Sequence, residues 1–364
     1  MTSASLLDDA ERIGQTLVPV AEAGTPGRVN RDLVAALGRA GLLSRLFDEL
    51  TARELCQVRQ GLARVCPEAE TAFAVQGLGG VPLQRFGSAP VRDRWVESLA
   101  KGDDIAAFAL TEPDAGSDAA NLKMVAESDG DGFRLSGEKT YISNAPDATV
   151  ATVFARTTPD TGAKGVTAFA VPMTEVPGEP IAMLSPHPIG RWTFDGVYAG
   201  PDQVLGEVDG GFRVAMATLD LFRPSVGAFS LGMAEAALRI AVEHAQSREA
   251  FGSPIASFQG VSHQLADVRV DVEAARLLVY EAARAYDEGD EGAITGKAAI
   301  AKLHATETAQ RAVDVAIQVL GARGLEADST LAHLYKEVRA PRIYEGTSEI
   351  QRNIIARELF KGTI

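Results

Sequence analysis

The sequence contains little cysteine and histidine, and neither residue is placed to bind a metal. Its 364 residues include two cysteines, Cys56 and Cys66, which lie ten residues apart. The five histidines are never within five residues of one another. Neither spacing matches a zinc site, and two cysteines do not make a disulfide framework. We therefore expect no metal centre and a reducing compartment such as the cytoplasm.

A long apolar run and a targeting signal are also lacking. The longest apolar stretches are too short to cross a bilayer. The first residues, MTSASLLDDAERIG, are acidic and lack the basic, apolar and small-residue order of a signal peptide. These two absences predict a cytoplasmic protein that does not span a membrane.

Positive charge is scarce relative to negative charge. The chain has 35 Lys and Arg residues against 49 Asp and Glu residues, a formal net charge of −14. Nucleic-acid binding needs a basic surface, so this balance argues against nucleic acid as the main partner. A phosphorylated small molecule needs only a local group of donors and stays possible. With 46% hydrophobic and 23% charged residues, the chain has the composition of a globular protein, and its 364 residues are enough for two or three domains.

What is present falls into three consecutive regions. Residues 1–107 carry apolar positions at three- and four-residue spacing, as in RDLVAALGRAGLL, which predicts helices. Residues 108–212 contain β-branched and aromatic stretches between turn residues, which predicts a small β domain with strands in GFRLSGEKTYISNA, ATVFART and GVTAFAVPM. Residues 213–364 are helical again. This order predicts a mainly α fold with a central β domain and argues against a doubly wound α/β fold.

The C-terminal region has the apolar periodicity of a helical bundle. Two stripes recur at steps of three and four residues, and we expect both to be buried. The first stripe is Val261, Leu265, Val268, Val272, Ala275 and Val279, and the second is Val313, Ile317 and Leu320.

Several common catalytic motifs are missing, and one loop attracts attention instead. The chain has no P-loop, no G-x-G-x-x-G after a strand and no G-x-S-x-G. In AAFALTEPDAGSD, an apolar strand ends at Leu110 and enters a loop with Pro113, Gly116 and Ser117. Such a loop is either an ordinary tight turn or one that presents backbone N–H groups and hydroxyls to a phosphate. The residues alone leave both alternatives open.

A second loop precedes the last helix, in RIYEGTSEIQRNIIAREL from Arg342 to Leu359. Ser348 and Gln351 match a capping box, which predicts that the helix starts there with an apolar face that includes Ile350 and Ile354. Glu345 belongs to neither the cap nor this face. It is either a solvated loop acid or a carboxylate held at the mouth of a site.

Five ordered motifs resemble the acyl-CoA dehydrogenase family of flavoproteins: ALTEPDAGSD, GEKTYISNA, SREAFGSPIASFQ, IQVLGARG and IYEGTSEIQRNIIAREL. The resemblance covers essentially the whole chain, including RFGSAPVRDRWVESLAKGD before the β domain. It implies an N-terminal helical domain, a β barrel-like domain and a C-terminal four-helix bundle. It also implies an enzyme that oxidises acyl thioesters.

The resemblance further implies a bound FAD that is shared between subunits, and hence a homodimer or homotetramer. Within one subunit, the matching cofactor positions are Phe108, Leu110, Thr111, Gly116, Ser117, Tyr141 and Ser143. The positions that match contacts from a neighbouring subunit or from the last helix are Arg248, Phe251, Gln318, Gly321, Thr347 and Glu349. No metal is implied.

The same resemblance makes Glu345 the catalytic base, with Arg223, Tyr344 and Gly346 at the substrate. Some relatives place the base on an earlier helix just before an arginine, but that position here is Phe222, which cannot take a proton. In the family, the base removes the α-proton while hydride passes from the β-carbon to flavin N5. Because the α-proton of a thioester is weakly acidic, the base must act together with donors to the enolate oxygen. We expect burial beside the flavin to raise the pKa of Glu345.

The chain departs from the family between 189–192 and 202–212, where it is shorter than typical members. In the family, that region lies near the nucleotide part of coenzyme A, so the resemblance makes an acyl carrier protein the expected carrier. Dehydrogenases of polyketide clusters, which make hydroxymalonyl or methoxymalonyl extender units, are similarly compact. There the step could be oxidation of a hydroxy-aldehyde rather than desaturation.

Three other functions stay open. They are an ordinary short-chain acyl-CoA dehydrogenase, a flavin monooxygenase or other redox enzyme on the same fold, and a non-catalytic or nucleic-acid-binding relative. The sequence does not name the acyl group, the carrier or the electron acceptor that reoxidises the flavin.

Overall fold

The computed structural model describes residues 5–290 and 292–364, which form two compact units. Each unit is assembled from separate stretches of the chain. The first comprises 5–16, Thr51–Glu70 and Asp220–Ile364 apart from residue 291, and the second comprises Leu17–Leu50 and Thr71–Leu219. Three helices have residues in both units: α1 (Leu6–Glu22), α4 (Pro67–Phe86) and α6 (Gly211–Ser247). The division into 1–107, 108–212 and 213–364 stays a prediction, and its first four residues lie outside the described part of the chain.

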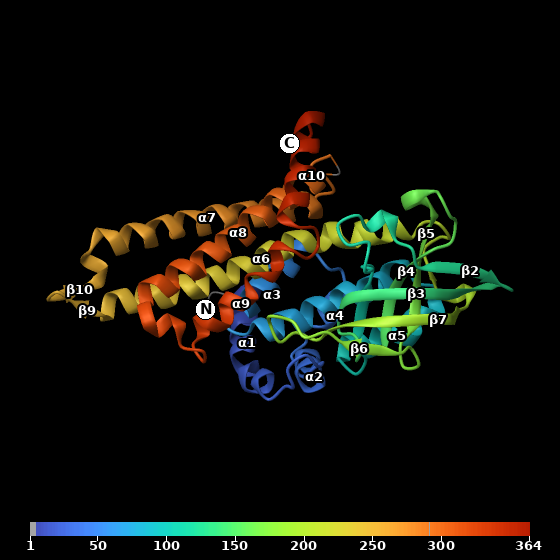
Figure 1. Cartoon of the computed structure of the whole chain (residues 1–364), viewed down its shortest axis with the longest axis horizontal. Helices are drawn as coiled ribbons and strands as arrows, with labels where there is room; N and C mark the ends of the chain where they lie inside the picture. Colours follow the sequence, from blue (N-terminus) through green and yellow to red (C-terminus); the bar gives the residue numbers. More distant parts are fainter. Residues whose placement is uncertain (1–4, 291) are drawn as a thin grey trace. The chain divides into compact units, whose positions relative to one another are not determined.

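The first unit is helical (Figure 1). Besides parts of α1, α4 and α6, its helices are α3 (Ala52–Ala63), α7 (Gln259–Asp287), α8 (Ile294–Leu320), α9 (Thr330–Glu337) and α10 (Ser348–Lys361). A short hairpin, β9 (Glu249–Ala250) and β10 (Ser253–Pro254), joins α6 to α7. Small residues let the helices approach closely. A Cβ on Gly232 of α6 would lie 2.5 Å from the carbonyl oxygen of Gln60 in α3.

The predicted stripe on α7 is buried only in its later turns. Val268, Val272, Ala275 and Val279 are buried, whereas Val261 and Leu265 are half-buried. Leu265 lines an open hollow on this unit, which is why it stays partly exposed. On α8, Val313 is buried, and the two stripe residues that follow it are half-buried.

Helix α6 also passes a test of length and composition for crossing a bilayer. It is the single helix among the described residues that does so. However, 78% of its most apolar stretch is buried inside the protein. Such burial is typical of a core helix.

The second unit contains a mixed eight-stranded sheet and helices α2 (Arg31–Arg39) and α5 (Ala89–Lys101) (Figure 1). The strand order is β6-β7-β3-β2-β4-β5-β8, and β1 pairs in parallel with β4. The strands are β1 (Ala106–Ala109), β2 (Val125–Asp129), β3 (Gly132–Ser143), β4 (Val150–Arg156), β5 (Val166–Pro172), β6 (Gly178–Pro180), β7 (Ile189–Ala199) and β8 (Val204–Leu205).

The three strands predicted from sequence are confirmed as β3, β4 and β5. Strands β4 and β5 lie antiparallel and are buried along almost their whole length, which accounts for their continuous apolar sequences. Strand β3 has an irregular register with β7 between Lys139 and Ile142. This irregularity turns the intervening Tyr141 outward, with φ of +55° and 59% of its surface exposed.

Candidate active site

The loop before α10 holds Glu345 in an unusual backbone conformation. Glu345 has φ of +51° and Gly346 has φ of +92°, so two consecutive residues lie in the left-handed region. Glycine adopts this region freely, but a residue with a Cβ does so at a cost of about 1–3 kcal/mol. Strain of this kind clusters at functional sites, where the surroundings impose it.

The predicted capping box is wrong by one residue. Thr347 is the N-cap of α10, because its Oγ1 accepts from the N–H of Ile350 at 3.3 Å. Ser348 instead donates to Glu307 at 2.7 Å. Gln351 turns its side chain toward the loop and donates to the carbonyl oxygens of Glu345 and Gly346. Ser348 and Gln351 therefore form tertiary hydrogen bonds instead of the local capping box.

The predicted apolar face of α10 is also not what the helix buries. Ile350 and Ile354 are half-buried, and the buried positions are Ser348, Gln351 and Glu358. Because two of these bond the preceding loop and α8, the helix is docked by polar contacts rather than by an apolar stripe.

The carboxylate of Glu345 is not a solvated acid. Its Oε2 atom is buried and makes no hydrogen bond within the described structure. Burial raises the pKa of Glu345, and the nearby charges of Arg59, Lys302 and Arg223 oppose that rise without cancelling it. A carboxylate with a free, buried oxygen and a raised pKa has the properties of a general base.

Two of the surrounding cations have carboxylate partners of their own. Arg59, from α3, is 2% exposed and forms an ion pair with the fully buried Glu70, and its Nη1 donates to Ser225 at 2.7 Å. Arg223, which the sequence placed at the substrate, is 8% exposed and bonds Asp220 at 2.9 Å. The structure thus brings Arg223 close to Glu345, as the predicted site requires.

The remaining predicted substrate residues flank the base. Tyr344 is partly exposed, and the Gly346 carbonyl oxygen accepts bonds from two side chains. Phe222, at the alternative base position, is fully buried in the core. Glu345 is thus the candidate base in the loop. The alternative position on α6 holds a phenylalanine that packs in the core and cannot accept a proton.

Sequence analysis missed Arg59 and Lys302, although both carry a recognisable signal. Each occupies a position at helical spacing that would otherwise hold an apolar residue. Arg59 lies between the buried Leu55 and Leu62 on α3. Lys302 lies in a run of buried alanines on α8. A charge within an apolar stripe indicates a buried ionic group with a specific partner.

The second unit carries the loop predicted to contact a flavin, and a buried ion pair fixes it. Lys139 in β3 is fully buried and donates to Glu112 at 2.8 Å and to the Leu110 carbonyl at 3.0 Å. The other donors to the Glu112 carboxylate are the backbone N–H groups of Lys123 (2.5 Å) and Met124 (3.0 Å). The loop contains a tight turn, in which Glu112 and Ala115 exchange backbone hydrogen bonds of 3.2 Å, and the Glu112 side chain anchors this turn to β3.

This anchoring brings the predicted flavin positions of the second unit together. The N–H of Thr140 donates to the carbonyl oxygen of Thr111 at 3.0 Å, which joins the loop to the strand that carries Tyr141 and Ser143. Phe108 lies on β1, with its ring 4.9 Å from that of Phe154. The predicted flavin positions Leu110, Thr111, Gly116 and Ser117 come directly after β1 in the sequence.

These residues suit a flavin nucleotide. A Cβ placed on Gly116 would meet nothing within 4 Å, and Gly116 and Ser117 are both exposed. They can therefore offer backbone N–H and hydroxyl donors to phosphates without added charge. Tyr141 presents an exposed aromatic ring on a strained backbone, which suits contact with a planar ring system. The donor set thus fits FAD.

The positions predicted to reach a neighbouring subunit lie in the first unit. Phe251, in the β9–β10 turn, is 97% exposed, and Gly321 has φ of +62° just after α8. Burial and the charges of Arg323 and Arg248 lower the pKa of His244, so these cations lie near one another. A group of cations beside an exposed ring suits the phosphates and adenine of a nucleotide. Gln318 lies in the last turn of α8, Thr347 is the N-cap of α10, and Glu349 lies in the first turn of α10.

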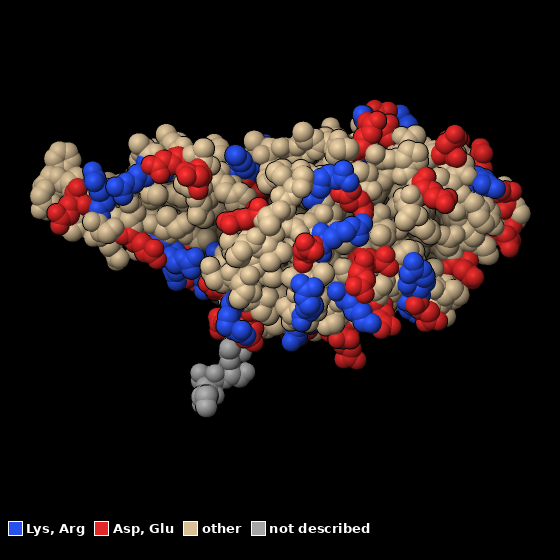
Figure 2. Space-filling view, turned by 90° about the horizontal axis from the view of Figure 1, so that it is seen from below, with Lys and Arg blue, Asp and Glu red and all other residues tan. Residues whose placement is uncertain are grey.

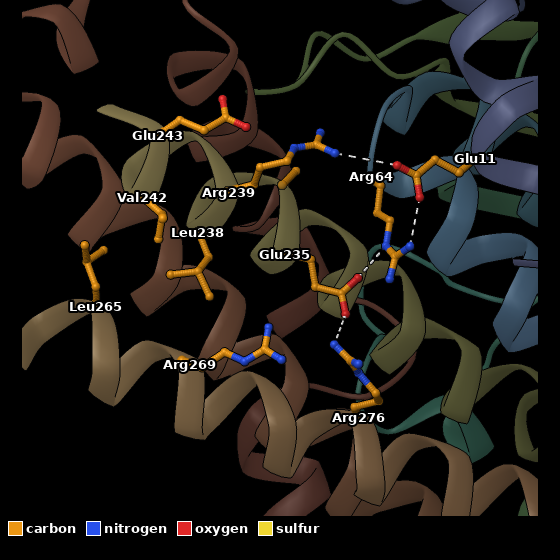
Figure 3. A pocket seen from close by; sticks show the side chains of 11 residues that line it. Glu11, Arg64, Glu235, Leu238, Arg239, Val242, Glu243, Leu265, Arg269 and Arg276 are labelled. Atoms are coloured by element: carbon orange, nitrogen blue, oxygen red, sulfur yellow. Dashed lines mark hydrogen bonds and ion pairs between the residues drawn. The ribbon is translucent and has the colours of Figure 1, made fainter. Parts of the chain in front are cut away.

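A separate hollow of about 480 Å³ on the first unit has no assigned role (Figure 3). Its charged side chains bond one another: Glu235 accepts from Arg64 at 2.5 Å and Arg276 at 2.6 Å, and Arg64 also donates to Glu11 at 2.8 Å. Mutually neutralised groups leave little charge for a ligand. No three His, Cys, Asp or Glu residues of 5–290 and 292–364 gather as a metal site.

Comparisons with known proteins identify the family. Sequence models of the acyl-CoA dehydrogenase N-terminal, middle and C-terminal domains match residues 4–103, 107–191 and 209–360. The mitochondrial short-chain specific acyl-CoA dehydrogenase of Bos taurus is 38% identical over 343 residues, covering 90% of this chain and 82% of that protein. The chain belongs to the acyl-CoA dehydrogenase family. It is an FAD-dependent oxidoreductase that acts on acyl thioesters.

Similar solved structures confirm the predicted fold class: N-terminal helical, central β and C-terminal helical domains. Butyryl-CoA dehydrogenase from Megasphaera elsdenii has a TM-score of 0.91 at 30% identity, covering 99% of both chains. The FAD complex of PigA has a TM-score of 0.91 at 27% identity and the same coverage. The prolyl acyl carrier protein oxidase AnaB has a TM-score of 0.90 at 26% identity, covering 97% of both chains.

Proposed function

We propose that this acyl-CoA dehydrogenase family member oxidises a short, polar acyl thioester, with Glu345 as the base that removes the α-proton. The observation that carries the proposal is the buried, unbonded Oε2 atom of Glu345, whose pKa is raised. When bound, FAD supplies the acceptor for the hydride that leaves the β-carbon.

The groups around the base have separate roles in the proposed reaction. Arg59, Arg223 and Lys302 keep enough positive potential at the site for Glu345 to ionise despite its burial. Once substrate excludes water, the free oxygen of Glu345 can accept a proton directly. The backbone N–H of Glu345, fixed by the loop, is a donor for the thioester oxygen on which negative charge develops.

We propose that the FAD is held by Phe108, Leu110, Thr111, Gly116, Ser117, Tyr141 and Ser143 of one subunit. Arg248, Phe251, Gln318 and Gly321 of a second copy complete the site, so the protein is a homodimer or homotetramer. An almost fully exposed Phe251 supports this sharing, because a large exposed ring usually has a partner. Thr347 and Glu349 are the further contacts at the start of α10.

For the carrier, we propose an acyl carrier protein, as in polyketide extender-unit biosynthesis. The shortened segment between 189–192 and 202–212 supports this choice. AnaB, a structural relative, is described as acting on a prolyl acyl carrier protein. Charges of both signs are interspersed on the face drawn in Figure 2, so a basic docking patch has to be local.

The relatives favour one other candidate, a short-chain acyl-CoA dehydrogenase, because the mammalian proteins carry that description. Both candidates need an electron acceptor from outside the chain, and both fit a cytoplasmic protein whose two cysteines are buried and not joined in a disulfide.

Anaerobic mixing of the FAD-loaded protein with matched thioesters tests these proposals. We expect flavin bleaching by a short polar acyl group, faster on an acyl carrier protein than on coenzyme A, and slower as salt increases. Equal bleaching by the coenzyme A thioester, without salt dependence, would favour the short-chain acyl-CoA dehydrogenase. In a parallel aerobic assay with an external electron donor, oxygen consumption with a hydroxylated product would instead indicate a monooxygenase.

A further inference from the structure

Two buried side chains hold the backbone that carries Glu345. Lys302 Nζ, from α8, donates to the carbonyl oxygens of Tyr344 at 2.7 Å and Gly346 at 2.5 Å. Gln351 Nε2, from α10, donates to the carbonyl oxygens of Glu345 at 3.2 Å and Gly346 at 2.9 Å. Three consecutive carbonyl groups are thus bonded to fixed donors on two helices.

Packing alone does not explain a lysine at this place. Lys302 is 1% exposed, and burial lowers its pKa to about 8. A buried ammonium group is costly, and an apolar residue would continue the alanine stripe of α8 without that cost. The two hydrogen bonds to backbone carbonyl oxygens offset this cost, and an apolar residue could not form them.

The bonded segment is also the strained one. Glu345 lies at φ of +51°, and such a conformation persists only where neighbouring groups impose it. Lys302 bonds the carbonyl oxygens of Tyr344 and Gly346, so the ammonium group fixes the peptide plane that precedes Glu345 and the plane that follows Gly346. The plane between them is held by Gln351, which bonds the carbonyl oxygen of Glu345.

Lys302 also differs from the other cations near Glu345. The guanidinium groups of Arg59 and Arg223 form ion pairs with Glu70 and Asp220. Within the described part of the chain, Lys302 donates only to carbonyl oxygens and has no carboxylate ion pair. Its charge is therefore available to act on the Glu345 carboxylate.

We propose that Lys302 is a positioning residue for Glu345, which fixes the loop through two carbonyl groups and keeps an unneutralised positive charge beside the base. The inference rests on the proposed function, because it takes Glu345 to be the base. The charged and titratable groups that face Glu345 or its loop are Arg59, Glu70, Asp220, Arg223, Lys302, Glu337 and Tyr344.

The test compares three variants of the FAD-loaded protein. Lys302→Met removes the donor and the charge, Gln351→Met removes a donor but no charge, and Glu345→Gln removes the base. For each, FAD content and melting temperature are measured first. The rate of flavin reduction by saturating thioester is then followed anaerobically across pH.

We expect Lys302→Met to slow flavin reduction at least tenfold with a smaller change in KM, because a misplaced base acts on the transition state. The pH at which the rate falls to half should move upward, since a positive charge beside the carboxylate is gone. Gln351→Met should slow the reaction without moving that pH. Lys302→Met in the Glu345→Gln background should add little, since both changes affect one function.

Different outcomes overturn different parts. A wild-type rate and pH profile in Lys302→Met, with Glu345→Gln impaired, would refute the role of Lys302 and leave the proposed function intact. A wild-type rate in Glu345→Gln would refute the proposed base and this inference with it. If Lys302→Met fails to hold FAD, Lys302→Gln keeps two N–H donors without the charge. An unmoved pH profile in that variant would contradict the proposal.

Discussion

Two loops of this protein each pair a buried lysine with a carboxylate, and they use the lysine differently. In the second unit, Lys139 bonds the Glu112 carboxylate directly, and two backbone N–H groups bond it as well. In the first unit, Lys302 bonds the carbonyls around Glu345 and leaves the carboxylate oxygen Oε2 unbonded. Burial lowers the pKa of both lysines to about 8.

The difference separates a structural carboxylate from one that can react. Three fixed donors bond the two oxygens of the Glu112 carboxylate, so this group ties β3 to the loop predicted to contact the flavin. Glu345 is held by its backbone, and its Oε2 atom stays free to accept a proton. A buried charge is therefore informative only together with the list of its hydrogen-bond partners.

The largest expected effect is that of Glu345→Gln on the reaction. Flavin reduction by saturating thioester should slow by roughly 10² to 10⁴-fold, the usual range for a positioned acid or base. The free energy of unfolding should not fall in this variant. Because the pKa of Glu345 is higher in the folded than in the unfolded protein, ionisation of this side chain destabilises the folded state above its unfolded pKa, and glutamine does not ionise. Stopped-flow reduction and urea unfolding measure the two quantities. If Glu345→Gln reduced flavin at the wild-type rate, Glu345 would not be a reactive carboxylate and would not differ in this respect from Glu112.

Glu112→Gln should show the opposite pattern. It leaves the buried Lys139 without its counter-charge, and breaking one side of a buried ion pair costs about 3–5 kcal/mol. The free energy of unfolding of the second unit and the affinity for FAD should both drop. Lys139→Met is the matched control and should cost less, because Glu112 keeps its two N–H donors. Unchanged urea unfolding in Glu112→Gln would show that the pair is not structural.

The pH dependence of flavin reduction gives a sharper version of the comparison. Glu345 works as a base only when ionised, so the rate should fall as pH drops through its raised pKa. The fall should therefore occur above the ordinary glutamate pKa of about 4.3. Rates measured at saturating substrate test this, with pH-stable FAD absorbance as the control. A rate that stays flat down to that ordinary value contradicts a raised pKa.

The smallest expected effect concerns the cap of α10. Thr347→Ala removes the bond to the Ile350 N–H and should cost about 1 kcal/mol at the first turn. Faster hydrogen exchange of the Ile350 amide measures that loss. Ser348→Ala should leave this amide protected, because Ser348 bonds Glu307 instead. If the Ile350 amide exchanged equally fast in both variants, Thr347 would not be the sole N-cap of α10.

Much of the fold could be predicted because its signals are local. The steps of three and four residues predicted long helices, and the alternation of turn residues with β-branched stretches predicted β3, β4 and β5. The errors arose where tertiary contacts prevail. Leu265 belongs to a perfect apolar stripe but faces an open hollow, and Gln351 leaves the capping box to bond the Glu345 loop.

The sequence by itself determined the family, the cofactor class and the position of the candidate base, because these depend on ordered motifs in one chain. The tertiary structure decided which carboxylate is free. Glu112 and Glu345 are both glutamates in turn-rich loops, and nothing near either in sequence shows that Lys139 neutralises one while Lys302 holds only the backbone of the other. Those partners lie 27 and 42 to 44 residues away along the chain, so only folding brings them together.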